Sequence, residues 1–154
     1  MQHSSEIIIS DTSCLILLYK IDKLDLLKSL SDKVFITKTI KDEFEKSLPS
    51  WIQIKSPSNS HYQQILEMDL DPGEASAIAL SLEFDNSILI IDDLKGRKVA
   101  DKLRLKYSGT FGLILRAKHE GILTAVRPIL DKIRGTDFHF SENLFDTILK
   151  EAGE

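Results

Sequence analysis

Short apolar runs recur along the chain and predict the strands of one sheet. Residues 7–10, 34–37 and 88–91 are runs of mostly β-branched and other apolar side chains, typical of short buried strands in a parallel sheet. Residues 51–54 alternate between apolar and polar side chains, which predicts an edge strand, and residues 107–109 predict a last short strand.

Helical spacing of apolar side chains predicts a helix in most of the segments between and after these strands. Thr37 or Thr39 is suited to cap the third helix, which stops before Pro49, and Gly121 and Gly135 follow two later helices as terminators. The predicted helices span residues 12–21, 24–30, 41–47, 61–68, 72–82, 94–105, 110–121, 123–133 and 142–150.

The clearest helix start is the sequence Asp71-Pro-Gly-Glu74. Asp71 suits the N-cap, Pro72 the first helical position, and Glu74 the third, where its side chain can complete a capping box. Helical spacing predicts that this helix has one apolar face, made of Ala75, Ile78, Ala79 and Leu82.

Strands separated by helices predict an α/β fold, a three-layer α/β/α domain with a mainly parallel central sheet. The length of 154 residues suits one domain, residues 1–154, with the last helix (142–150) as an appendage. A composition of 42% hydrophobic and 29% charged residues is that of an ordinary folded protein and not of a disordered one.

The compartment follows from the single cysteine and from the lack of long apolar segments. Cys14 lies in an apolar run and has no partner for an internal disulfide, which suits a reducing compartment. Residues 1–6 lack the basic start of a signal peptide, and no apolar run approaches the roughly 20 residues that span a bilayer. A cytoplasmic protein is expected.

The net charge of −4 conceals a strong asymmetry along the chain. Residues 94–134 contain eleven Lys or Arg and three acidic residues, a net charge of +8, so the rest of the chain carries −12. A basic segment directly after an acidic pair suits a polyanionic substrate such as RNA, although surface helices often carry lysines without such a role. The candidate phosphate contacts are Lys95, Arg97, Lys98 and Lys102.

Acidic side chains are expected to gather at the carboxyl edge of the predicted sheet. Asp11 follows the first apolar run, and Asp92 and Asp93 follow a later one. Glu43 shares a helical stripe with apolar side chains, and Glu74 belongs to the capping box. In open α/β sheets the carboxyl ends of strands line the ligand crevice, and carboxylates crowded there need a cation. Thr12 and Ser13 are suited to add a hydroxyl near such an ion.

Each acid also has a purely structural alternative. Asp11 suits the N-cap of the next helix, Glu74 is fully explained by its capping box, and Glu43 is equally well an exposed helical side chain. The adjacent pair Asp92 and Asp93 is harder to explain structurally, because two carboxylates next to a buried strand are costly without a compensating charge.

Oxygen ligands without clustered His or Cys favour Mg²⁺ or Mn²⁺ over zinc. The four histidines, His3, His61, His119 and His139, are scattered along the chain. Such ions assist phosphodiester hydrolysis by polarising a phosphate and activating water. The sequence 109–112 (GTFG) is able to present backbone N–H groups to a phosphate, but a turn with a helix cap is the favoured interpretation.

Five segments together resemble a PIN domain, in particular the small prokaryotic branch related to VapC-type toxins. The segments are residues 8–13 (IISDTS), Glu43, residues 73–79 (GEASAIA), residues 90–100 (IIDDLKGRKVA) and residues 109–114 (GTFGLI). The resemblance implies a metal-dependent ribonuclease in which Asp11, Glu43, Glu74 and Asp92 or Asp93 surround Mg²⁺ or Mn²⁺. It also implies a homodimer and, for a toxin, a small antitoxin partner. The chain departs from many of these toxins by carrying Glu74 where Asp is frequent and two aspartates after the later strand.

The sequence therefore predicts an endoribonuclease that cleaves single-stranded RNA with metal and water, with no membrane partner. The alternative is a non-catalytic module of the same fold that binds nucleic acid or protein. A phosphotransfer receiver carries its acidic pair after the first strand, and a haloacid-type phosphatase has Asp-X-Asp there, whereas this chain has Asp11-Thr-Ser13.

Overall fold

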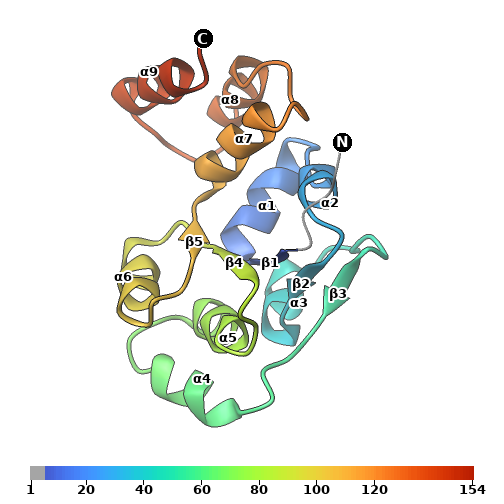
Figure 1. Cartoon of the computed structure of the whole chain (residues 1–154), viewed down its shortest axis with the longest axis vertical. Helices are drawn as coiled ribbons and strands as arrows, with labels where there is room; N and C mark the ends of the chain where they lie inside the picture. Colours follow the sequence, from blue (N-terminus) through green and yellow to red (C-terminus); the bar gives the residue numbers. More distant parts are fainter. Residues whose placement is uncertain (1–5) are drawn as a thin grey trace.

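The computed structural model describes residues 6–154 (Figure 1). Residues 1–5, which include His3 and most of the segment that argued against a signal peptide, lie outside the described residues. A five-stranded sheet has the order β3-β2-β1-β4-β5 with every neighbouring pair parallel. Its strands are β1 (Ile7–Ser10), β2 (Val34–Ile36), β3 (Ile52–Ile54), β4 (Ser87–Ile90) and β5 (Tyr107–Ser108).

The two central strands, β1 and β4, are buried along their whole length. They pair in register from Ile7 opposite Ser87 to Ser10 opposite Ile90. Because helices cover both faces of the sheet, these strands do not alternate between apolar and polar side chains, and each has only one serine, at one end. The predicted three-layer α/β/α fold with a parallel sheet is confirmed.

Helices connect the strands and extend the chain after β5. They are α1 (Thr12–Lys20), α2 (Asp25–Leu30), α3 (Lys38–Phe44), α4 (Ser60–Leu66), α5 (Pro72–Ser81), α6 (Leu94–Lys102), α7 (Thr110–His119), α8 (Arg127–Arg134) and α9 (Glu142–Glu151). In Figure 1, α1 and α2 lie above the central strands and α5 lies below them. Among residues 6–154, no helix is both long and apolar enough to traverse a lipid bilayer.

Helix α5 differs from the prediction of a single apolar face. Gly73 and residues 75–81 are all buried, because α5 packs on β1 and β4 and is also covered by α3, α4 and α6. Leu82, predicted to be part of the apolar face, is 39% exposed just beyond the helix end. The small side chains of α5 allow neighbouring elements to approach it from several directions.

Several other predicted helix limits differ from the structure, three of them for a clear local reason. Helix α3 begins at Lys38, because Thr37 caps it through the N–H of Ile40. Helix α6 ends at Lys102, after which Arg104 adopts a left-handed conformation (φ 59°). Helix α8 begins only at Arg127, next to its proline, so the stretch 123–126 is not helical.

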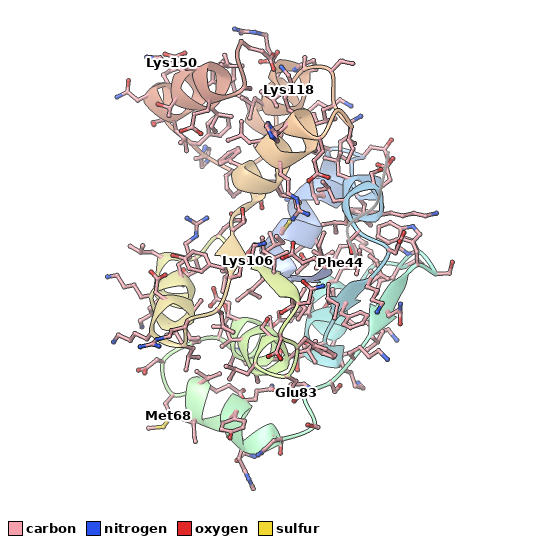
Figure 2. All side chains as sticks on the ribbon, viewed as in Figure 1. Phe44, Met68, Glu83, Lys106, Lys118 and Lys150 are labelled. Carbon is pink, nitrogen blue, oxygen red and sulfur yellow. The ribbon has the colours of Figure 1, made fainter. Side chains whose placement is uncertain are left out.

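The last three helices form one end of the molecule, where Lys118 and Lys150 are labelled in Figure 2, and α4 with Met68 lies at the opposite end. Helix α9 buries Phe145, Ile148 and Leu149, which belong to the same apolar cluster as the strands. The predicted C-terminal helix is therefore packed against the rest of the fold.

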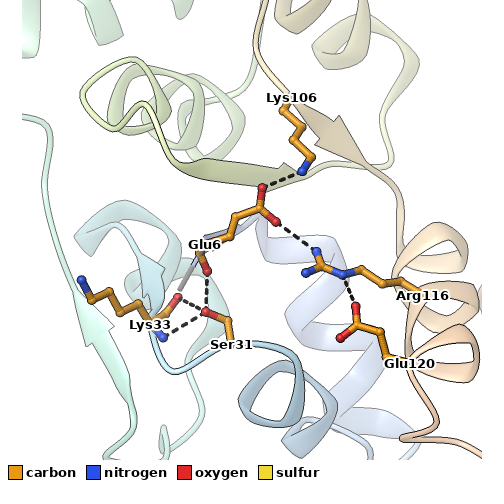
Figure 3. Close-up of polar contacts among 6 residues, drawn as sticks. All are labelled: Glu6, Ser31, Lys33, Lys106, Arg116 and Glu120. Carbon is orange, nitrogen blue, oxygen red and sulfur yellow. Dashed lines mark hydrogen bonds and ion pairs between the residues drawn. The ribbon is translucent and has the colours of Figure 1, made fainter. Parts of the chain in front are cut away.

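Glu6 joins the start of β1 to the elements that follow β4. Its carboxylate accepts hydrogen bonds from Lys106 (2.7 Å) and Arg116 (3.1 Å), and Arg116 also donates to Glu120 (2.7 Å) (Figure 3). These contacts anchor the β5–α7 segment at the amino edge of the sheet. The residues that follow β1, β4 and β5 lie at the other edge.

Candidate functional site

The carboxyl edge of the sheet brings Asp11 next to Asp92. Strands β1 and β4 run side by side and end together, with Ser10 opposite Ile90, and the Asp11 N–H donates to the Ile90 carbonyl (3.0 Å). Parallel strands in register therefore deliver the residues after them to one place, as expected from the sequence.

Asp11 is almost fully buried (2% exposed), and both of its carboxylate oxygens accept backbone hydrogen bonds. Oδ1 accepts the N–H of Cys14 (2.8 Å), which caps α1, and Oδ2 accepts the N–H of Asp92 (3.3 Å). Burial raises the pKa of Asp11 to about 7, and the charge of Asp92 acts in the same direction. Asp11 thus caps a helix and also faces the acidic edge.

Asp92 is held by the first residue of α7. Thr110 donates its backbone N–H to Oδ1 (2.7 Å) and its hydroxyl to Oδ2 (2.6 Å). The Arg97 guanidinium lies 3.8 Å from Oδ1 and donates from Nε to the Ile91 carbonyl (2.9 Å). Gly109 allows this approach, because a methyl group there would overlap Arg97 and lie 2.8 Å from Asp92. The backbone N–H of Thr110 belongs to the sequence 109–112, which was a candidate for phosphate binding. It donates instead to Asp92.

Glu74 lies in electrostatic range of the other acids. Its pKa is raised to about 8, first by burial, then by a side-chain hydrogen bond and the charge of Asp71, then by the charges of Asp93 and Asp11. Asp93 is exposed and caps α6 by accepting the N–H of Gly96 (3.1 Å). The two aspartates after β4 therefore diverge: Asp92 turns to α7 and Asp93 to α6.

Asp71 joins this acidic set, although only a capping role was predicted for it. The cap is real, because Asp71 accepts the N–H of Glu74 (2.9 Å), yet its charge also acts on both Glu74 and Asp11. The available signal was its position three residues before Glu74, since an N-cap side chain lies beside the third helical residue.

Glu43 reaches the region from α3 through its contact with α1. It is exposed, and its Oε1 accepts the hydroxyl of Thr12 (2.5 Å). A methyl group on Gly73 would overlap the same carboxylate, so Glu43 lies between the starts of α1 and α5. Thr12 thus contacts a candidate acid, whereas Ser13 is exposed and lines a separate cavity with Phe138.

The candidate phosphate contacts are distributed along α6. Lys95, Lys98 and Lys102 are exposed, and the half-buried Arg97 is the one that contacts Asp92. The basic segment therefore begins directly beside the acidic edge, as expected from its place after Asp92 and Asp93 in the sequence.

The acidic set fits a hard divalent cation by the chemistry of its donors. All are carboxylates, and a carboxylate oxygen that accepts one N–H retains a lone pair for a metal. Across the described part of the chain, no three His, Cys, Asp or Glu side chains already lie where one ion would join them. Burial, reinforced by the charges of the neighbouring acids, raises the pKa values of both Asp11 and Glu74.

Comparison with known proteins agrees with this geometry. A family model described as a PIN domain matches residues 7–154, nearly the whole chain. No solved structure matches this chain. PIN domains are generally nucleases that use divalent metal ions, so the chain has a nuclease-type fold. This protein belongs to the PIN-domain family.

Proposed function

We propose that this protein is a metal-dependent endoribonuclease that hydrolyses phosphodiester bonds of single-stranded RNA. The observation that carries the proposal is the buried carboxylate of Asp11, which lies against Asp92 in a PIN-family chain. Burial of an ionised acid costs free energy unless hydrogen bonds or a compensating charge offset it, and strongly perturbed carboxyl groups cluster at functional sites.

Asp11, Glu74, Asp92 and Asp93 are the proposed ligands of Mg²⁺ or Mn²⁺. When bound, such an ion would polarise the phosphate, lower the pKa of a bound water and stabilise the leaving oxygen. Glu43, held by Thr12, is proposed to act at the rim of this site, where an exposed carboxylate is able to orient water. Thr110 keeps the carboxylate of Asp92 in a fixed direction.

The basic side chains of α6 are proposed to hold the RNA backbone. Arg97 lies at the acidic edge, and Lys95, Lys98 and Lys102 continue along the exposed helix. Each phosphate contact releases counterions, so binding is expected to weaken steeply as salt rises. These residues offer the substrate a positive path in a chain whose net charge is −4.

The test is Mn²⁺-dependent cleavage of a labelled single-stranded RNA. Asp11→Asn and Asp93→Asn are each expected to abolish cleavage while the thermal unfolding transition remains cooperative. Asp146→Asn removes an exposed carboxylate of α9 and serves as the matched control with full activity. Full activity in both Asp11→Asn and Asp93→Asn would reject the assignment.

A second candidate is a PIN-fold module that binds nucleic acid or protein without cutting. It is favoured by one observation, the lack of a preassembled three-ligand group within residues 6–154. Calorimetric titration with Mn²⁺ separates the two, because a pure binding module has no need of the ion.

We also propose that the protein is the toxin of a toxin–antitoxin pair and forms a homodimer. These proposals rest on the PIN family alone. A small open reading frame beside the gene, and a co-purified small partner that suppresses cleavage, would support the toxin assignment. Light scattering of the purified protein measures its molar mass and therefore tests the homodimer.

A further inference from the structure

A cavity of about 510 Å³ lies directly beside the acidic edge. Asp92 and Arg97 form one part of its wall, and helices α7 and α9 with the segment between α8 and α9 supply the rest. We call its aromatic part the aromatic pocket, defined by Phe111, Phe138 and Phe140. A volume of this size lies within the roughly 300–1,000 Å³ typical of small-molecule sites.

The three rings of the aromatic pocket are fixed by contacts with each other. Phe111 packs edge-on against Phe138 (centroids 5.8 Å apart) and against Phe140 (5.2 Å). Phe140 in turn lies parallel to the buried ring of Phe145 at 6.0 Å. Edge-to-face pairs hold rings in defined orientations, so the wall is preorganised.

These rings are only half-buried, although they contact the core. A purely structural aromatic cluster would gain more free energy by complete burial. Here all three rings line a cavity whose wall also carries the carboxylate of Asp92 and the guanidinium of Arg97. The cavity therefore has an apolar aromatic part and a charged part next to the proposed site of cleavage.

We infer that the aromatic pocket binds an unstacked base of the single-stranded RNA, next to the phosphate that lies at Asp92 and Arg97. The inference rests on the proposed function. Single-stranded RNA is recognised by stacking its splayed bases on aromatic side chains, and each base offers a flat face to stack. His139 and Thr147 line the same cavity with groups that hydrogen-bond base edges.

A nucleotide fits both parts of the cavity at once. Its base is flat and apolar on its faces, which matches the aromatic part, and its phosphate is an anion, which matches Arg97. An apolar peptide side chain would fill the first part and leave the guanidinium without an anion other than Asp92. The pocket thus selects single-stranded over duplex RNA, because a paired base is not free to enter.

The test compares two RNA hexamers with equal charge, one of uridines and one of abasic riboses. Binding is measured by fluorescence anisotropy with Asp93→Asn protein in Mg²⁺, a form expected not to cut. The uridine hexamer is expected to bind about 10- to 100-fold more tightly than the abasic one, the range that base–aromatic stacking provides. Phe138→Leu with Phe140→Leu keeps apolar bulk and is expected to remove most of this preference.

Tyr62→Leu is the matched control, because Tyr62 is an exposed aromatic residue of α4, at the far end of the molecule from α9 (Figure 1). It is expected to keep the full preference for the uridine hexamer. Thermal unfolding of each variant verifies that it is folded. Equal binding of the two hexamers, or an unchanged preference in the double variant, would overturn the inference. If base-dependent binding holds but the unmutated protein does not cut with Mn²⁺, the nuclease proposal fails and the pocket stands.

Discussion

Thr110 donates two hydrogen bonds to one carboxylate, that of Asp92, from its backbone N–H (2.7 Å) and from its hydroxyl (2.6 Å). Thr110 is fully buried and begins α7, while Asp92 follows the β4 strand. The first N–H groups of a helix have no acceptor within the helix, and Asp92 accepts the N–H of Thr110. Asp92 is thereby fixed in one direction at the edge of the sheet.

We expect that loss of the Thr110 hydroxyl weakens metal binding without unfolding the protein. Thr110→Val keeps the shape of the side chain but frees Asp92 Oδ2, and removal of a hydrogen bond to a metal ligand typically costs about 10- to 100-fold in metal affinity or activity. Thr110→Ser retains the hydroxyl and is expected to keep most of the metal affinity and most of the cleavage activity. Calorimetric Mn²⁺ titration and RNA cleavage measure the effect. An unchanged Mn²⁺ affinity in Thr110→Val would show that the contact is only structural.

The two aspartates after β4 are expected to differ in their effect on stability. Asp92→Asn keeps one oxygen that accepts a hydrogen bond from Thr110, but its NH₂ group is unable to accept the second one, and the charge beside Arg97 is lost. A loss of about 1–3 kcal/mol in the free energy of unfolding is therefore expected. Asp93→Asn keeps an oxygen for the N–H of Gly96 and is expected to change stability by less than about 0.5 kcal/mol.

Urea denaturation without metal measures this difference, and Mn²⁺ titration of the same two proteins assigns the ligand. If Asp93→Asn destabilises the protein as much as Asp92→Asn, the divergent roles of the two side chains are refuted.

The metal-free protein is expected to lose stability as pH rises from about 4 to 8. Burial raises the pKa of Asp11 from 3.8 to about 7, and burial with Asp71 and neighbouring charges raises that of Glu74 from 4.5 to about 8. Because the folded state binds these protons more tightly than the unfolded state, their contribution is fully present below about pH 4. It is lost as pH passes the raised values. For Asp11 the change is on the order of 2–4 kcal/mol.

Asp11→Asn isolates this effect, since its amide does not titrate. In EDTA, the free energy of unfolding of the unmutated protein, measured relative to Asp11→Asn, is expected to fall between about pH 4 and pH 7. Saturating Mn²⁺ is expected to reverse the fall, because a cation stabilises the ionised carboxylates. A difference that stays constant with pH would contradict the raised pKa of Asp11.

Much of the geometry of the candidate site was predictable because it depends on strand ends and helix caps. An apolar run followed by Asp11 or by Asp92 specifies a residue at the carboxyl edge once the sheet is parallel. The cap of α5 followed directly from Asp71, Pro72 and Glu74. Such signals are local, so they survive without knowledge of the tertiary structure.

The remaining features depend on contacts between distant segments. Thr110 lies 18 positions after Asp92, and its local sequence indicates only a helix start. The all-round burial of α5 is hidden because alanine and serine give little hydrophobic contrast between the faces of a helix. The aromatic pocket combines α7 with the segment before α9, two parts that only folding brings together.

Gly73 is expected to control the position of Glu43. Gly73→Ala places a methyl group where the Glu43 carboxylate now lies, and this flexible side chain is expected to turn away and release Thr12. Alanine is the better helix former by about 1 kcal/mol, so stability is not expected to fall. If Glu43 takes part in cleavage, Gly73→Ala reduces the rate about as much as Glu43→Ala does. The double variant then loses little more, because the two changes remove one interaction. A loss of rate in the double variant equal to the product of the two single losses would show that the two changes act independently. That result, or full activity in Gly73→Ala, would exclude a role in cleavage for Glu43 in the position seen in the structure.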